Sequence, residues 1–222
     1  MNSERGSAPA TGLETLYPFL YSGAGDLDRV LAQVRQSTVD KAREIIALRR
    51  KLCEDNGERL VACAGEMAKA FEAGGRLLAF GNGGSSTDAQ DLASLFLNPP
   101  GDTIPLPAFA LTNDVAVVTA LSNDIGFDVV FARQLGAFGR AGDIAVGLST
   151  SGNSLNLVRG FDEAARLGML TIGIAGYDGG RMAELTTVDH LFVVPSPSVH
   201  RIQEAQTTLY HALWELCAQK TG

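Results

Sequence analysis

The sequence predicts an α/β protein in which helices cover both faces of a parallel sheet. Two observations carry this prediction. After residue 76, five short runs of apolar residues recur along the chain, and segments with helical periodicity separate them. Strands that are apolar on both faces and joined through helices are typical of parallel sheets. The 222 residues, of which 45% are hydrophobic, suffice for one domain with its own core.

The N-terminal third of the chain is predicted to be a leader followed by helices. Residues 1–24 are rich in Gly, Ser, Ala and Pro, lack the pattern of a secretory signal, and are expected to be disordered. A helical stripe then follows at Leu27, Val30, Leu31 and Val34, and a second one runs from Leu60 to Phe71. We therefore expect a single domain over 25–222, with a helical appendage at 25–75 that packs within the chain or between subunits.

The apolar runs give the strands in chain order. They lie at 77–80, 107–111, 143–149, 170–175 and 190–194. Residues 154–168 have helical character, and a closing helix is predicted at about 200–219, with an apolar stripe that runs from Ile202 to Leu216. We expect this last helix to lie at a subunit interface.

Charge and cysteine content limit the possible partners. The formal net charge is −7, which disfavours direct binding of nucleic acid. Cys53, Cys63 and Cys217 fit no CxxC spacing, as expected for reduced thiols in a cytoplasmic protein. No apolar run reaches 18 residues, so no membrane span is predicted.

Two loops at strand ends carry the same chemistry. "GNGGSS" (81–86) follows the first apolar run, and "STSGNS" (149–154) follows the third, each before a predicted helix. Glycines let a backbone turn present several N–H groups to one anion, and a helix N-terminus favours negative charge. In the first loop Ser85 and Ser86 lie at the helix start; the second loop offers the hydroxyls of Ser149, Thr150, Ser151 and Ser154. Neutral donors of this kind can bind a phosphate dianion without lysine.

Three other interpretations of the first loop are possible. A dinucleotide fingerprint needs a third glycine where this chain has Ser86, and a Walker A loop needs a lysine that is absent here. The remaining alternative is a tight strand-to-helix turn with an N-cap serine. A second loop of the same kind on the same sheet favours phosphate binding over that alternative.

The order of these motifs resembles a known family. "GNGGSS…DAQ", "LSND", "STSGNS", "AGYDGG" and "RIQEAQ" are similar to the sugar isomerase (SIS) domain, and within it to the phosphoheptose isomerases and the DnaA initiator-associating proteins. The resemblance runs from about residue 25 to the C-terminus. It implies a flavodoxin-like three-layer sandwich with a five-stranded parallel sheet, and a homotetramer whose sites lie between subunits.

The resemblance also implies which residues contact a phosphorylated sugar. All of the family's contact positions match in type in this chain: Asn82, Gly83, Gly84, Asn123, Asp124, Ser149, Thr150, Ser151, Ser154 and Gln203.

The residues that the family uses for chemistry match less well. Aldose–ketose isomerisation needs a base at carbon and an acid or a metal at the carbonyl oxygen. The isomerases have a metal-linked set, of which Gln203 and His211 are present, whereas Asp91 replaces a histidine and Leu95 replaces the catalytic glutamate. Leucine can neither accept a proton nor ligate a metal. A zinc site at Asp91, Gln203 and His211 would be weak, because zinc favours His and Cys.

Two functional classes therefore remain open. One is a phosphosugar isomerase of the sedoheptulose 7-phosphate type, with His211 as a catalytic group and an altered base. Glu204 and Asp124 are candidates for that base, but no feature of the sequence selects either. The other class is a non-catalytic phosphosugar-binding tetramer that acts as a sensor or adaptor, similar to the DnaA initiator-associating proteins.

Overall fold

The computed structural model describes residues 24–221. The predicted leader at 1–24 thus lies outside the described residues, except for its last residue. The chain divides after Glu44 into two compact units. Each unit is described by itself.

One long helix replaces the two N-terminal helices that we predicted. Helix α2 runs without a break over Ala24–Glu72. This stretch contains no proline, and an isolated glycine such as Gly57 weakens a helix without ending it. In the first unit, the side chains of Leu27, Leu31 and Val34 are about half exposed, at 52%, 44% and 56%. The predicted apolar stripe is therefore present, but the described part of this unit does not bury it.

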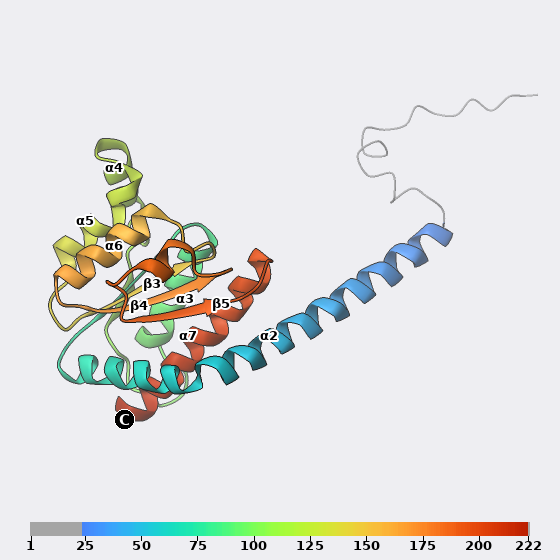
Figure 1. Ribbon diagram of the computed structural model, residues 1–222, viewed down its shortest axis with the longest axis horizontal. Coiled ribbons are helices and arrows are strands. Elements are labelled where there is room, and N and C mark those ends of the chain that lie inside the picture. Colours follow the sequence, from blue (N-terminus) through green and yellow to red (C-terminus); the bar gives the residue numbers. More distant parts are fainter. Residues whose placement is uncertain (1–23, 222) are drawn as a thin grey trace, which may run out of the picture. The chain divides into compact units, whose positions relative to one another are not determined.

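The second unit contains the parallel sheet (Figure 1). All neighbouring strands pair in parallel, in the order β2-β1-β3-β4-β5. The strands are β1 (Leu77–Gly81), β2 (Ala108–Ala110), β3 (Ile144–Ser149), β4 (Leu170–Gly176) and β5 (His190–Val194). The prediction of a five-stranded parallel sheet is confirmed, and each strand overlaps its predicted range.

Helices cover both faces of this sheet. One face of the sheet is covered by α3 (Gly84–Leu97), α7 (Val199–Thr221) and the part of α2 from Leu52 onward. Together with alternate sheet residues, these helices form what we call the first core. On the other face, α5 (Val130–Phe138) and α6 (Leu155–Arg166) bury the remaining sheet residues. In β1, Leu77 and Ala79 face the first core while Leu78 and Phe80 face the second, as the two-residue period of a strand requires. The fold is the three-layer sandwich that the family resemblance implies.

Three shorter elements complete the unit. Helix α4 spans Val115–Asp124, the 3₁₀ helix η2 spans Phe127–Val129, and η3 spans Gly180–Glu184. Helix α4 has no buried residue among those described, although it is rich in Val and Ala. Within the described part of the chain, no helix is both long and apolar enough to cross a membrane.

Helix α7 packs on the chain's own sheet. Its stripe of Ile202, Ala205, Leu209 and Leu213 is buried in the first core. A role for α7 in a subunit interface stays a prediction, and it would have to use the helix faces that this core leaves uncovered.

Candidate functional site

The two predicted phosphate loops lie side by side. The sheet order reverses between β1 and β3, because the chain leaves β1 toward β2 and returns to the other side of β1 at β3. Ligands of open α/β sheets bind at such a switch point, outside the carboxyl ends of the strands. Gly81 and Leu148 are register partners, so "GNGGSS" and "STSGNS" begin next to each other.

The first loop turns directly from β1 into α3. Gly83 has a φ of +54°, a conformation that glycine adopts without a steric penalty. The amide side chains of Asn82 and Asn156 exchange two hydrogen bonds of 2.9 Å, which tie this loop to the first turn of α6. Ser85 is buried, whereas Ser86 donates a hydrogen bond of 2.7 Å to Thr112. The exposed backbone of Gly83 and Gly84 is thus the part of this loop that a ligand can approach.

In the second loop, two backbone N–H groups donate to hydroxyl oxygens of the same loop. The backbone N–H of Gly152 donates to Oγ of Ser149 at 3.0 Å, and that of Asn153 donates to Oγ of Ser151 at 3.2 Å. Ser154 begins α6 without a side-chain cap bond. The sequence predicted that peptide N–H groups and hydroxyls both bind the phosphate. Two of these N–H groups are already bonded within the loop, whereas the hydroxyls of its serines and threonine can still donate.

A glycine-rich turn after β4 is hydrogen-bonded to the second loop. The backbone N–H of Arg181 donates to Oδ1 of Asn153, and that of Met182 donates to the carbonyl of Gly152, each at 3.0 Å. A side chain on Gly152 would collide with the backbone of Gly179. This close approach explains why the "AGYDGG" stretch accompanies the serine-rich loop.

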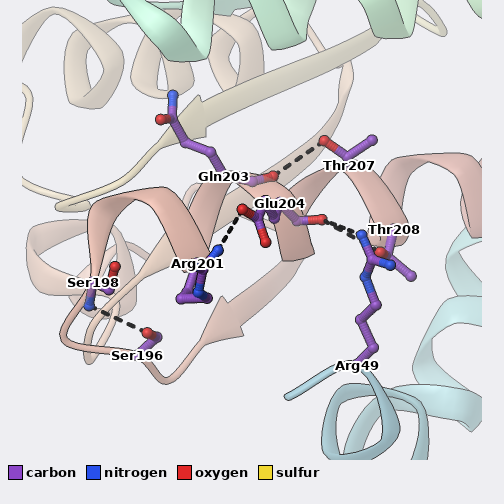
Figure 2. Close-up of polar contacts among 8 residues, drawn as sticks. All are labelled: Arg49, Ser196, Ser198, Arg201, Gln203, Glu204, Thr207 and Thr208. Carbon is purple, nitrogen blue, oxygen red and sulfur yellow. Dashed lines mark hydrogen bonds and ion pairs between the residues drawn. The ribbon is translucent and has the colours of Figure 1, made fainter. Parts of the chain in front are cut away.

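Helix α7 contacts both loops through two glutamines. Gln206 is fully buried, and its amide donates to the carbonyls of Ser149 and Ile174 at 3.2 Å each. The amide nitrogen of Gln203 lies against Gly84 on α3, so close that a side chain on Gly84 would collide with it. Figure 2 shows Gln203 leaving α7 in a direction away from Arg49. The structure therefore brings Gln203 to the first loop, and its role as a substrate contact stays a prediction.

A set of polar residues lies farther along the boundary between α3 and α7. The hydroxyl of Tyr210, whose ring is buried, donates to Oδ2 of Asp91 at 2.6 Å. Nε2 of His211 lies 3.8 Å from the same oxygen. Burial, followed by the bond to Asp91, raises the pKa of Tyr210 above its usual range. We call Gly84, Asp88 and Asp91 together with Gln203, Thr207 and Tyr210 the α3–α7 seam.

Asp88 is the unusual member of this seam. One of its carboxylate oxygens, Oδ2, is buried and has no hydrogen-bond partner among the described residues. Burial and the nearby charge of Asp91 raise the pKa of Asp88 to about 6. A carboxyl group with such a pKa near a substrate site is a candidate for proton transfer.

A zinc site at Asp91, Gln203 and His211 stays a prediction, and its oxygen-rich donor set suits zinc poorly. Gln203 and His211 are eight residues apart on α7, which separates them by about 12 Å along the helix axis. Leu95 packs against the first core, and among the described residues no three His, Cys, Asp or Glu side chains are placed to hold a metal ion. Nε2 of His211 lies 3.8 Å from Oδ2 of Asp91, whereas the amide of Gln203 lies against Gly84 in the first turn of α3.

Two predicted sugar contacts lie apart from the loops in a single chain. Asn123 and Asp124 end α4, are exposed, and hydrogen-bond each other at 2.8 Å. Helix α4 packs mainly on η2 and α5. Their role as sugar contacts stays a prediction.

Sequence reasoning missed several residues that shape the site. They are Asp88, Thr112, Asn156, Gln206 and Tyr210. Gln206 could have been noticed, because it is a polar residue between the apolar positions Ala205 and Leu209. The importance of Asp88 and Tyr210 depends on which helices pack together, which local patterns do not show.

The chain is similar in sequence to known proteins. The SIS domain family model matches residues 42–176. The phosphoheptose isomerase of Aquifex aeolicus is 42% identical over 175 residues, which covers 78% of this chain and 91% of that protein. The phosphoheptose isomerase of Desulfovibrio desulfuricans is 45% identical over 177 residues, which covers 79% and 83%.

Solved structures show the same similarity. The phosphoheptose isomerase GmhA from Neisseria gonorrhoeae is 38% identical, has a TM-score of 0.77, and is matched over 83% of this chain and 99% of that one. A phosphoheptose isomerase from Francisella tularensis is 33% identical with a TM-score of 0.72, over 82% and 98%. On these grounds the chain belongs to the SIS domain family, in its phosphoheptose isomerase branch.

Proposed function

We propose that the protein is a phosphosugar isomerase that interconverts a ketose phosphate and an aldose phosphate, with sedoheptulose 7-phosphate or a close relative as substrate. The observation that carries this proposal is the pairing of two neutral anion-binding loops at the β1–β3 switch point. The names of the relatives supply the substrate class.

The phosphate of the substrate binds the second loop in this proposal. Ser149, Thr150, Ser151 and Ser154 offer O–H groups at the end of β3 and the start of α6. Hydrogen bonds to a charged acceptor are stronger than neutral ones, so a few hydroxyls suffice to hold a dianion. The sugar chain then extends past Gly83 and Gly84 toward Gln203, which lies against the first turn of α3.

Isomerisation moves one proton between adjacent carbons and another between their oxygens. His211 serves the oxygens in this proposal, since imidazole can donate and accept protons near neutral pH. Oδ2 of Asp91 lies 3.8 Å from Nε2 of His211 and helps to orient the ring. We assign each proton transfer to a side chain of this protein, because a donor set of Asp91, Gln203 and His211 suits zinc poorly.

The working form is proposed to be a homotetramer with sites shared between subunits. Asn123 and Asp124 lie apart from the loops of their own chain, and the apolar face of α4 next to them is not buried by the described residues. A second copy that covers α4 would place these two side chains at a neighbouring site.

The test is a turnover assay. The purified protein is incubated with sedoheptulose 7-phosphate, with and without added zinc, and aldose formation is followed. We expect turnover that is independent of zinc and lost in His211→Ala. Saturable binding of the phosphosugar without turnover would contradict the proposal and favour the second candidate, a non-catalytic phosphosugar sensor. The observation that favours this second candidate is Leu95 at the position of the isomerases' glutamate.

A further inference from the structure

We propose that Asp88 is the base that moves the carbon-bound proton in this protein. The inference rests on the isomerase function proposed above and supplies the group that Leu95 cannot provide. Leu95 packs against the first core and has no ionisable group. An enediol mechanism still needs one group that removes a proton from carbon and returns it to the neighbouring carbon.

The placement of Asp88 follows from two contacts on either side of it. Gly84 and Asp91, which flank Asp88 on α3, both contact α7: Gly84 lies against Gln203, and Asp91 accepts from Tyr210. Gly84 and Asp91 are seven residues apart on α3, and their partners Gln203 and Tyr210 are seven residues apart on α7. The two helices therefore run parallel to each other here. Asp88 is one turn after Gly84, a step of about 6 Å, and shares its helix face. It therefore faces α7 between Gln203 and Tyr210, next to the proposed path of the sugar.

The surroundings of Asp88 differ from those of Asp91. Asp91 is exposed and held by the hydroxyl of Tyr210, so its carboxylate already has a fixed partner. Asp88 keeps its buried Oδ2 without a partner among the described residues. The acidic groups around it are Asp91 on α3 and Tyr210 on α7, and His211 follows Tyr210. A buried carboxylate oxygen without a hydrogen-bond partner, next to a like charge, favours the protonated form of the carboxyl group.

The proposed step balances without an oxidant or a metal. The carboxylate of Asp88 takes a proton from C1 of the ketose, and the electron pair of that C–H bond forms the C1=C2 bond. The carbonyl electron pair moves to O2, which accepts a proton from His211. The protonated Asp88 then returns its proton to C2 while O1 gives its proton to His211, which leaves an aldehyde at C1.

The first test uses Asp88→Asn, which keeps the shape of the side chain but cannot accept the proton. We expect kcat for sedoheptulose 7-phosphate to fall about 100- to 10,000-fold. In deuterated water, incorporation of deuterium at carbon should fall in parallel. Binding of the phosphosugar by calorimetry should change less than threefold. The matched control is Asp162→Asn on α6, whose Oδ1 still accepts the bond from Thr187 and whose turnover should equal that of the wild type.

Chemical rescue separates a base from a structural residue. In Asp88→Ala, added formate can occupy the space of the lost carboxylate, and we expect it to restore turnover at least tenfold. Turnover of Asp88→Asn within tenfold of the wild type, or Asp88→Ala that binds the phosphosugar but gains nothing from formate, would overturn the role of Asp88 and leave the isomerase function standing. A wild type that binds the sugar without turnover would overturn both.

Discussion

The hydroxyl groups of the second loop are not equivalent. Oγ of Ser149 and Oγ of Ser151 each accept a backbone N–H of the loop, so these residues shape the loop as well as offering an O–H group. Ser154 makes no side-chain bond to the helix that it begins. Its hydroxyl can therefore be removed without disturbing the fold, which makes it the better probe of phosphate binding.

Ser154→Ala should weaken binding of sedoheptulose 7-phosphate by about 10- to 100-fold, since a hydrogen bond to a charged group contributes about 1.5–3 kcal/mol. Its melting temperature should stay at the wild-type value, because no cap bond is lost. Calorimetric titration and thermal unfolding measure the two quantities. Unchanged affinity would show that the phosphate does not bind this loop.

Asp88 should make stability depend on pH. The folded-state pKa of Asp88 is raised to about 6 by burial and Asp91, so the folded form binds a proton more tightly than the unfolded chain. The resulting stabilisation is complete below about pH 4 and is lost as the pH rises through 6. Asp88→Asn should therefore be more stable than the wild type at pH 8, by on the order of 1 kcal/mol after allowance for solvent screening.

Urea unfolding at pH 4 and at pH 8 checks this prediction. The difference between Asp88→Asn and the wild type should be present at pH 8 and nearly absent at pH 4. A difference of equal size at both pH values would mean that the pKa of Asp88 is not raised in the folded state.

Among the elements, α7 connects the sheet to the site. Its buried Gln206 bonds the last residue of β3 and a residue of β4, and Gln203 on the same helix reaches the first loop. A polar side chain inside an otherwise apolar helix face holds α7 in one register against the strand ends. The positions of the two loops relative to the α3–α7 seam depend on that register.

Gln206→Leu should destabilise the protein by about 1–3 kcal/mol, because the carbonyls of Ser149 and Ile174 lose their buried donor. Affinity for the phosphosugar should also fall, since Ser149 begins the second loop. Urea unfolding and calorimetry provide the two measurements. The comparison variant is Thr208→Ala, which loses only a bond of 3.4 Å to the carbonyl of Glu204. Equal stability of the two variants would show that the bonds of Gln206 do not stabilise the packing of α7 on the sheet.

The elements that the sequence predicted best are those set by local pattern. Each strand lies in a short run rich in apolar residues, and each of the two loops is formed by the residues directly after its strand. The break expected in α2 was wrong, because a gap in the apolar stripe marks loss of burial and not the end of a helix. Asp88 and Tyr210 could not be assigned roles, since their surroundings come from a helix more than 100 residues away in the chain.

At the scale of the whole molecule, exposed apolar surface remains to be explained. In the first unit Leu27, Leu31 and Val34 follow one helix stripe and are about half exposed. In the second unit Val115, on α4, is 67% exposed. Apolar helix faces of this kind are typical of surfaces that bind another chain. A homotetramer is the assembly predicted from the family resemblance.

Sedimentation tests that assembly. We expect the wild type to sediment as a tetramer, and Leu31→Glu combined with Val34→Glu to shift it to smaller species, because two charges would enter the apolar stripe. Arg35→Glu, a charge change at an exposed position next to that stripe, is the control and should leave the tetramer intact. A wild type that sediments as a monomer at every concentration would contradict the prediction.

The most direct measurement is a crystal structure of the protein soaked with sedoheptulose 7-phosphate. Our account predicts that the phosphoryl oxygens accept hydrogen bonds from the hydroxyls of Ser149, Thr150, Ser151 and Ser154, with the sugar chain beside Gly84 and Gln203. A phosphoryl group bound anywhere else would contradict the account, whatever the assay reports.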